Sequence, residues 1–440
     1  MVEITKMKAE KQKAEKEAFF CTTKELSRLG MEQIPTQFQS HKHLIYSSPA
    51  TLAFNSPGAE GFGVKRAGLA VPDSIMLIVA PGCCGRNTSL ISSMKEYNDR
   101  FYYLMMDETD IVTGRHLKKI PKAVEEICSV CPKKPSVVMI CITCVDALLG
   151  TDMERVCKKA EEQVEIPVRP CYMYALTREG RKPPMVHVRQ SLYSLLEPGK
   201  KKGNVVNLLG FFSPLVDDCE IYDLLHSAGV KTIHEISRCK DYMEYQTMSE
   251  ANFNLVLHHE ARFAAEDFHN RLQIPFIELR RLYQIDKIEN QYHALGNALG
   301  VAFYDEKYKK QAEDALEKFR KKCPDASFAI GECLNADPFE LALALIRYGF
   351  SVPEIYGTIT VENFTYIRSL AKISPETKVF SNMEPTMIYY DPAKSDVNLA
   401  IGKDACYYHP DCPYVMWNGE EQPYGYAGVR RLFEQLLEVV

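Results

Sequence analysis

Two stretches decide the fold of this chain: S-I-M-L-I-V-A-P-G-C-C-G at residues 74–85 and S-V-V-M-I-C-I-T-C-V-D-A-L-L-G-T-D at residues 136–152. Each is an apolar, β-branched run that stops at cysteine and passes into a turn that contains glycine. Such a run is typical of a buried parallel strand that leads into a loop and a helix. Because ligands bind at the carboxyl ends of strands in open α/β sheets, two cysteine loops at one edge suggest a thiolate-bound metal centre.

Strand and helix patterns alternate from these stretches to the end of the chain. A βαβ series predicts mostly parallel sheets with right-handed crossovers, so the fold class is α/β with three Rossmann-like domains. Glu and Lys recur at close spacing over residues 1–30, which predicts a solvated helix. We expect an N-terminal helical extension and lead-in at 1–70 and domains at 71–200, 201–323 and 324–440, the last closed by an amphipathic helix. The expected strands are 74–80, 101–106, 136–142, 166–170, 204–211, 231–236, 254–258, 275–279, 327–331, 352–356 and 378–381.

The composition excludes several classes of protein. The chain has 440 residues and a net charge of −5, which argues against a nucleic-acid binder that relies on phosphate contacts. No apolar run approaches the roughly 18 residues of a membrane span, and the charged N-terminus lacks the apolar core of a secretory signal, so we expect a cytoplasmic protein. There is no G-x-x-x-x-G-K-[ST] and no G-x-G-x-x-G after a strand, so a partner would hydrolyse any ATP involved.

Fifteen cysteines point to metal binding or redox chemistry for some of them, because a reducing compartment disfavours disulfides. Gly82 and Gly85 permit tight turns around Cys83 and Cys84, and a thiolate at a helix N-terminus has a lowered pKa. In the second stretch Cys144 is favoured over Cys141 as a ligand, because it lies at the turn. A bare C-x-x-C is also compatible with a thioredoxin-like pair or with two core residues. The simpler interpretation, a small core side chain, applies to Cys157, Cys219 and Cys323.

Other candidate groups carry weaker predictions. His258-His259-Glu260 ends a strand of the second domain, where an imidazole could serve as metal ligand or acid, or simply pack at a domain boundary. Cys128 and Cys131 lie at the opposite end of the first sheet and are expected to be structural. Asp107 and Asp110 are expected to cap a helix, with partner docking or metal binding as alternatives. The segment 406–412 is a Cys/His loop whose spacing fits no zinc module, and we expect it to be structural or to form a pocket wall.

Five motifs in order resemble the nitrogenase component 1 family, which includes the nitrogenase subunits, the cofactor-assembly scaffold pair and nitrogenase-like tetrapyrrole reductases. Matches run from about Gly61 to the C-terminus. The first three are P-G-C-C-G at 81–85 for the family's G-P-x-G-C-G, D-E-T-D-I-V-T-G at 107–114 for D-E-x-D-V-V-F-G-G, and C-V-D-A-L-L-G-T-D at 144–152 for C-x-x-x-L-I-G-D-D. The others are N-L-V at 254–256 and G-Y-A-G at 425–428 for the terminal G-[YF]-x-G.

The resemblance implies paired subunits with an iron–sulfur cluster at their interface, and electrons supplied by a separate iron protein with its own P-loop. By position, Cys84 and Cys144 would be cluster ligands, with Gly82, Cys83 and Gly85 shaping the cofactor-binding loop. The family's upstream cysteine is missing here, because residues 54–61 read F-N-S-P-G-A-E-G. Two cysteines per chain, doubled by an identical partner, would supply the four ligands of a [4Fe–4S] cluster. A paralogous partner subunit, or ligation by Cys83, is the alternative.

This chain differs from the nitrogenase subunits at the positions that hold the active-site cofactor. Nitrogenase α subunits hold that cofactor with a cysteine after N-L-V, where this chain has His258, and the cofactor histidine falls near Val415 or Met416. Dinitrogen reduction is therefore not expected. The leading hypothesis is the catalytic-component subunit of a nitrogenase-like reductase with His258 or His259 as catalytic residues. The alternatives are a scaffold for metallocluster assembly, to which Cys333, Cys406 and Cys412 could add thiols, and a metal-free structural or regulatory partner.

Overall fold

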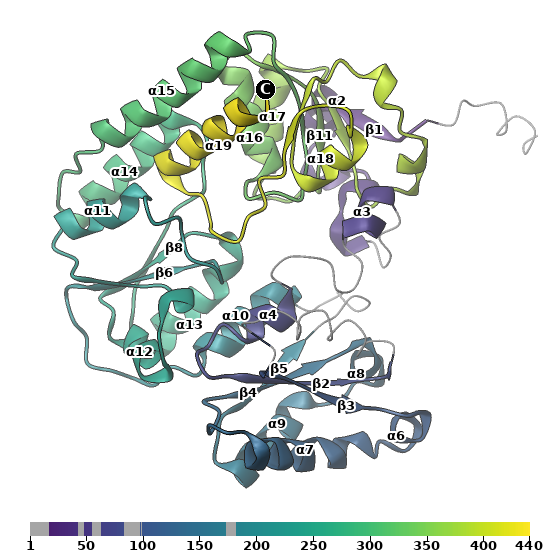
Figure 1. The fold of residues 1–440 in the computed structure, drawn as a ribbon, viewed down its shortest axis with the longest axis vertical. Helices are drawn as coiled ribbons and strands as arrows, with labels where there is room; N and C mark the ends of the chain where they lie inside the picture. Colours follow the sequence, from purple (N-terminus) through teal and green to yellow (C-terminus); the bar gives the residue numbers. More distant parts are fainter. Residues whose placement is uncertain (1–16, 43–47, 55–62, 83–96, 98, 173–181) are drawn as a thin grey trace, which may run out of the picture.

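Three open sheets make up the computed structural model, which describes residues 17–42, 48–54, 63–82, 97, 99–172 and 182–440 (Figure 1). The first has the order β3-β2-β4-β5, formed by Ile75–Ala80 (β2), Phe101–Met105 (β3), Val138–Ile142 (β4) and Val168–Tyr172 (β5). The second has the order β7-β6-β8-β9, formed by Val205–Leu209 (β6), Thr232–His234 (β7), Phe253–Val256 (β8) and Phe276–Glu278 (β9). All pairs within these two sheets are parallel.

The third sheet has the order β1-β12-β11-β10-β13-β14. Its strands are Phe20–Thr22 (β1), Ser327–Ile330 (β10), Ser351–Tyr356 (β11), Lys378–Phe380 (β12), Leu399–Ile401 (β13) and Tyr414–Val415 (β14). Only the pair of β1 with β12 is antiparallel among the described strands. The predicted α/β class with three mostly parallel sheets is confirmed, whereas the predicted domain boundaries stay predictions.

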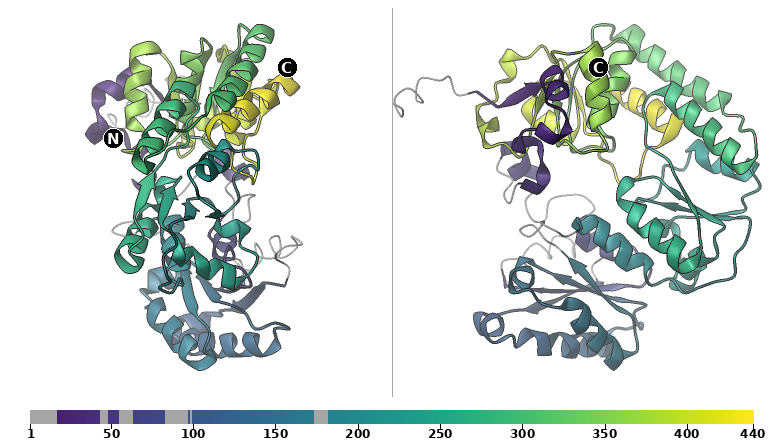
Figure 2. Two further views of the ribbon diagram at one scale, coloured as in Figure 1. Left: turned by 90° about the vertical axis from the view of Figure 1, so that its left-hand side faces the viewer. Right: turned by 180° about the vertical axis from the view of Figure 1, so that it is seen from behind.

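Helices cover the faces of the three sheets (Figures 1 and 2). Those of the first unit are Val64–Gly68 (α4), Glu108–Thr113 (α6), His116–Val130 (α7), Cys144–Leu149 (α8), Met153–Val164 (α9) and Pro184–Tyr193 (α10). Those of the second are Glu220–Ser227 (α11), Tyr242–Gln246 (α12), Arg262–Leu272 (α13) and Ile285–Leu299 (α14). Those of the third are Thr23–Leu29 (α2), Pro49–Phe54 (α3), Glu306–Lys322 (α15), Pro338–Arg347 (α16), Phe364–Ile373 (α17), Lys403–Tyr408 (α18) and Gly425–Val439 (α19). Within the described residues, no helix has the length and apolar character needed to span a membrane.

Alternation along β2 divides its side chains between two cores. Ile75 and Leu77 join the core beneath α7 and α9, whereas Met76 and Ile78 join the core on the side of α10. This second core continues into the second unit through Leu209 and its neighbours. The first two units therefore share a continuous apolar contact, which fixes their sheets relative to one another.

The segment before residue 42 departs from the predicted solvated helix. Phe20–Thr22 forms an edge strand on β12, and α2 begins only at Thr23. A capping box between Thr22 and Glu25 sets this start, and the preceding F-F-C-T favours a strand because aromatic and β-branched residues suit a pleated surface. Leu26 and Phe38 are fully buried in the core that serves the third sheet. The helix prediction is therefore wrong for Phe20–Thr22, and residues 1–16 lie outside the described residues.

Leu26→Ala is expected to lower the free energy of unfolding by about 3 kcal/mol, because it removes buried methyl groups and leaves a cavity. Urea unfolding followed by circular dichroism measures this. Leu29→Ala, on the same helix but 37% exposed, is the matched control and should change stability by less than about 0.5 kcal/mol. Equal effects of the two substitutions would contradict the docking of α2.

A buried carboxylate joins the second unit to the third. Glu340 in α16 accepts hydrogen bonds from the backbone N–H groups of Tyr283 and Gln284, at 2.9 and 3.4 Å, in the connection that precedes α14. Burial raises the pKa of Glu340 to about 7, although the side chain and backbone of Gln284 and the backbone of Tyr283 oppose the shift. The folded state therefore binds a proton at this residue at a pH where the unfolded chain has released it.

The free energy of unfolding is expected to fall by about 2 kcal/mol between pH 5 and pH 8 through Glu340 alone. The sign follows because the folded pKa lies above the usual 4.5, so stability present below pH 4.5 is lost as the pH rises toward 7. Urea midpoints at both pH values, for the wild type and Glu340→Gln, measure the effect. The substitution changes the free energy of unfolding by the same amount at both pH values. The difference in pH dependence between the wild type and Glu340→Gln therefore gives the contribution of Glu340. Identical slopes would contradict the raised pKa.

Candidate functional site

Each of the three sheets reverses its strand order at one pair of strands. In the first sheet β3 and β4 flank β2, in the second β7 and β8 flank β6, and in the third β11 and β13 flank β10. The crevice outside the carboxyl ends of such a pair is where open α/β sheets bind ligands. These switch points therefore show where functional side chains are expected.

The first switch point brings the two cysteine stretches together. Strands β2 and β4 pair in register from Ile75 opposite Val138 to Val79 opposite Ile142, so the loops that follow them begin side by side. Gly82 is the last described residue of the first loop, and a Cβ added there would meet no atom within 4 Å. Cys83, Cys84 and Gly85 lie outside the described residues, so their predicted roles are not addressed by the geometry.

The C-x-x-C of the second stretch divides between a strand and a helix. Cys141 is fully buried in β4 and pairs in register with Cys171, whereas Cys144 is the first residue of α8. Burial raises the pKa of Cys171 well above its usual range, with Cys141 adding to the shift. These two thiols therefore belong to the core. The structure therefore places Cys144 at the start of α8 and not in the expected turn, and its role as a metal ligand stays a prediction.

The residues next to Cys144 in the sequence bear on whether an iron–sulfur cluster fits there. Among the described residues, the buried hydroxyl of Thr143 has no hydrogen-bond partner, and neither has one carboxylate oxygen of Asp146. A buried hydroxyl of this kind can donate to a cluster sulfide, which is compatible with a cluster held by Cys144. Within the described residues no group of three or more His, Cys, Asp and Glu side chains could hold a metal ion.

The second switch point holds His258, which follows β8. Its ring lies edge-on to Phe211 at 5.7 Å between centroids and stacks on His259 at 4.5 Å. Gly210 at the end of β6 lies close by, because a Cβ there would be 2.8 Å from the backbone nitrogen of His258. His259 is exposed. The two predicted histidines are therefore adjacent at this switch point.

Burial and nearby positive charge keep the His258 ring neutral. Burial lowers the pKa of His258 well below its usual value, and Arg189, His259 and Arg281 add to the shift, although the side chain is 34% exposed. Nδ1 accepts a hydrogen bond from the backbone N–H of Glu260 at 3.3 Å, which leaves the hydrogen of the neutral ring on Nε2. Such a ring donates a hydrogen bond from Nε2, which suits ligand binding through that N–H better than metal ligation.

Two arginines beside His258 were not anticipated from the sequence. Arg189 in α10 reaches across from the first unit and pairs with Glu260 at 2.8 Å while it donates to the Gly210 carbonyl. Arg281 stacks on Phe211 with its guanidinium 4.3 Å from the ring centroid and donates to Gln422 at 2.6 Å. Its Nε is buried without a partner, and burial lowers its pKa. Only strand pairing and tertiary contact bring these residues together.

The third switch point carries two acidic residues that were also missed. Asp404, just after β13, accepts hydrogen bonds from the backbone N–H of Glu332 and Cys333 at 2.8 and 2.9 Å and from the Asn382 amide at 2.6 Å. Glu332, just after β10, accepts from Thr358. Burial raises the pKa of both acids. Polar residues that follow an apolar strand could have indicated Asp404, but the sequence analysis did not predict β13.

Several weaker predictions have clear outcomes. Asp107 and Asp110 form a capping box at the start of α6, which confirms the capping interpretation. Cys157 and Cys219 are buried, as expected for core residues. Cys128 and Cys131 lie at the end of α7, where the Cys131 thiol is 3.1 Å from the Tyr102 hydroxyl.

The segment 406–412 is not the predicted loop throughout, because Cys406 lies in α18. His409 is buried and lies 3.1 Å from Glu354, with the Tyr356 and Tyr390 hydroxyls also on that carboxylate. These contacts of His409 are typical of a packed interior, so the structural interpretation of this segment holds.

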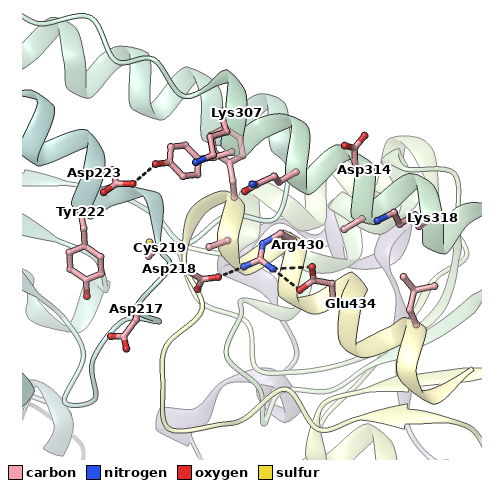
Figure 3. Close-up of a pocket in the computed structure, with 16 residues that line it drawn as sticks. Asp217, Asp218, Cys219, Tyr222, Asp223, Lys307, Asp314, Lys318, Arg430 and Glu434 are labelled. Carbon is pink, nitrogen blue, oxygen red and sulfur yellow. Dashed lines mark hydrogen bonds and ion pairs between the residues drawn. The ribbon is translucent and has the colours of Figure 1, made fainter.

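A cavity of about 640 Å³ lies away from these switch points, between α11, α15 and α19 (Figure 3). Some of its charged groups have partners in its lining: Arg430 contacts both Asp218 and Glu434, and Asp223 accepts a hydrogen bond from Tyr308. The groove contains no cysteine other than the buried Cys219. Its chemistry is unrelated to that of the cysteine loops.

The fold defines an open α/β protein of three mostly parallel sheets, with Cys144 at the start of the helix that follows β4 at the first switch point. Comparison with known sequences gives the family: residues 60–440 match the nitrogenase component 1 type oxidoreductases, and the chain belongs to this family. A nitrogenase iron-molybdenum cofactor biosynthesis protein NifE from Sinorhizobium fredii is 25% identical over 418 residues, which cover 89% of this chain and 82% of the relative. A NifE protein from Methanosarcina barkeri is 27% identical over 205 residues, which cover 42% and 43%.

Solved structures agree on the fold. The structure described as nitrogenase Cp1 at pH 6.5 superposes with a TM-score of 0.68 and 18% identity, over 90% of this chain and 92% of the other. The same protein at pH 5 gives a TM-score of 0.60 and 16% identity, over 89% and 88%. At these identities the likeness extends to the fold alone.

Proposed function

We propose that this chain is a scaffold on which an iron–sulfur metallocluster is assembled and then passed to an acceptor protein. The observation that carries this is the pairing of β2 with β4, which starts the two cysteine loops side by side at a switch point. The similarity to NifE proteins, which are named as cofactor biosynthesis proteins, favours assembly over turnover. The unpartnered Thr143 hydroxyl beside Cys144 supports a cluster at this place.

In this proposal Cys84 and Cys144 are the iron ligands of each chain. Gly82, Cys83 and Gly85 form the loop that lets the backbone approach the cluster. Two ligands from each of two chains complete a [4Fe–4S] cluster at the subunit interface. The cluster is the cargo of the scaffold, and the protein supplies thiolates and a buried surface for it.

The partner subunit in this proposal is a second copy of the chain or a paralogue. Exposed apolar side chains support an interface on this unit: Leu148, in the same helix as Cys144, is 66% exposed, and Val112 of α6 is 84% exposed. Large apolar side chains so open to water are typical of surfaces that another protein covers.

A nitrogenase-like reductase is the second candidate, and His258 is the observation that favours it. A neutral ring with its N–H at Nε2 beside two arginines suits hydrogen-bond donation to an anionic substrate. In that case His258 and His259 are the catalytic residues, and a separate P-loop iron protein donates the electrons. Neither candidate requires this chain to bind ATP.

The test is iron and acid-labile sulfide content after anaerobic purification, with electron paramagnetic resonance (EPR) of the dithionite-reduced protein. About four irons per dimer with a reduced-cubane signal are expected. The loaded protein is then mixed with an apo-ferredoxin as acceptor. Transfer of the cluster supports the scaffold. Retention of the cluster, with oxidation by a substrate in the presence of an iron protein and ATP, would establish the reductase instead. No iron after reconstitution would overturn both proposals.

A further inference from the structure

A buried histidine joins the start of α7 to the helix that begins at Cys144. His116 is 1% exposed, and its Nε2 lies 2.9 Å from Oδ1 of Asp146, the third residue of α8. Its Nδ1 lies 3.0 Å from the Asp110 carbonyl oxygen. The imidazole therefore bridges the α6–α7 connection and α8 with both nitrogens occupied.

The partners determine where the hydrogens lie. A carbonyl oxygen can only accept, so Nδ1 donates to Asp110. The contact between Nε2 and Asp146 then contains one hydrogen, whether the ring or the carboxyl carries it. Thr151 donates to the same Oδ1 at 3.0 Å. Rotation of the Asp146 side chain would leave buried groups unpaired, at a cost of about 1–3 kcal/mol each.

The support on the α7 side is itself fixed. Asp110 accepts hydrogen bonds from Arg115 at 2.7 Å and from Lys119 at 2.6 Å, and its backbone N–H donates to Asp107 at 2.7 Å. Hydrogen bonds from Lys119 and Arg115 keep the pKa of Asp110 well below its usual value. The carbonyl that accepts the hydrogen bond from His116 therefore belongs to an ion-paired residue of α6.

Stabilisation alone does not explain this arrangement. Replacing a buried polar pair with apolar side chains of similar volume is often neutral or stabilising, and here one carboxylate oxygen of Asp146 has no partner within the part of the chain that the structure describes. We propose, on the basis of the proposed function, that His116 and Asp146 are positioning residues that fix the first turn of α8 and with it the iron ligand Cys144. The specificity of the contact, rather than its net energy, is what holds the ligand in place.

The test compares anaerobically reconstituted wild type with His116→Ala and His116→Gln. The glutamine retains an N–H that can reach Asp146, and Lys118→Ala, an exposed change on α7, is the matched control. The measurements are iron per chain, EPR g-values and midpoint potential of the reduced cluster, urea midpoint, and the alkylation rate of Cys144 in the apoprotein. We expect His116→Ala to bind more than about half as much iron as the wild type. Its cluster should have shifted g-values and a changed midpoint potential, and the alkylation rate of Cys144 in the apoprotein should change about threefold. For His116→Gln we expect recovery toward the wild type.

The inference would be overturned if His116→Ala had the same g-values, midpoint potential and alkylation rate as the wild type. Equal changes in Lys118→Ala would also overturn it, as would a loss of stability and iron that His116→Gln does not restore. Absence of iron in the wild type would refute the proposed function, whereas the alkylation rate in the apoprotein would still report whether His116 positions Cys144. The two failures are therefore distinguishable.

Discussion

Replacement of Gly425 with alanine is expected to lower the free energy of unfolding by about 4 kcal/mol. Gly425 begins α19 with φ of +58°, in the left-handed region that side chains with a Cβ rarely adopt. An added Cβ would lie 1.8 Å from Oε1 of Glu220 and 2.2 Å from the Tyr292 hydroxyl. Both atoms are buried, so they cannot move into solvent to make room.

The displaced group is the cap of the closing helix. Glu220, the first residue of α11, accepts hydrogen bonds from the backbone N–H groups of Tyr426 and Ala427 at 2.6 and 3.0 Å, and from the Tyr292 hydroxyl at 2.6 Å. Burial raises the pKa of Glu220, and these donors oppose the shift. A Cβ at Gly425 therefore adds backbone strain, overpacking and the loss of charge-assisted hydrogen bonds at one place.

Urea unfolding monitored by circular dichroism measures the effect. Gly419→Ala is the matched control, because a Cβ there meets no atom within 4 Å and its φ lies outside the left-handed region. The control should change stability by less than about 0.5 kcal/mol. A Gly425→Ala protein as stable as the control would show that Glu220 does not cap α19.

Long apolar runs made most of the fold predictable. β2 and β4 were expected at 74–80 and 136–142 and are found at Ile75–Ala80 and Val138–Ile142, because a strand buried on both faces is apolar throughout. β13 and β14 have three and two residues, too few for any periodicity to distinguish them from a loop. β1 was missed because the lysines and glutamates before it dominate the pattern of the segment.

The candidate site was predictable only where the chemistry lies in one continuous motif. Cys144 comes directly after a predicted strand, so its place just beyond the end of β4 could be predicted from the sequence, although the structure has a helix there and not a turn. His116 and Asp146 are thirty residues apart, and Arg281 and His258 come together where both contact the ring of Phe211. Such contacts depend on strand order and on the crossing of helices, which local patterns do not encode. Asp404 was missed because β13, the strand before it, is too short to be predicted from the sequence.

Removal of either proposed iron ligand is expected to abolish cluster binding. Cys144→Ala and Cys84→Ala should each reduce iron after anaerobic reconstitution to less than about a tenth of the wild-type content, because a cubane with a missing thiolate is labile. The effect should be local: Cys144 lies at the start of a short helix at the sheet edge. Urea midpoints of both variants should therefore stay close to that of the wild type.

Cys141→Ala is the control that separates metal binding from packing. Cys141 lies three residues before Cys144 but is fully buried in β4 opposite Cys171, so its loss should cost stability and leave the iron content unchanged. Cys83→Ala, measured beside Cys84→Ala, decides which of the two adjacent thiols binds iron. Loss of iron in Cys141→Ala with retention in Cys144→Ala would reverse the assignment, because the ligand would then lie within the strand. Full iron in all four variants would exclude both cysteine loops as the cluster site.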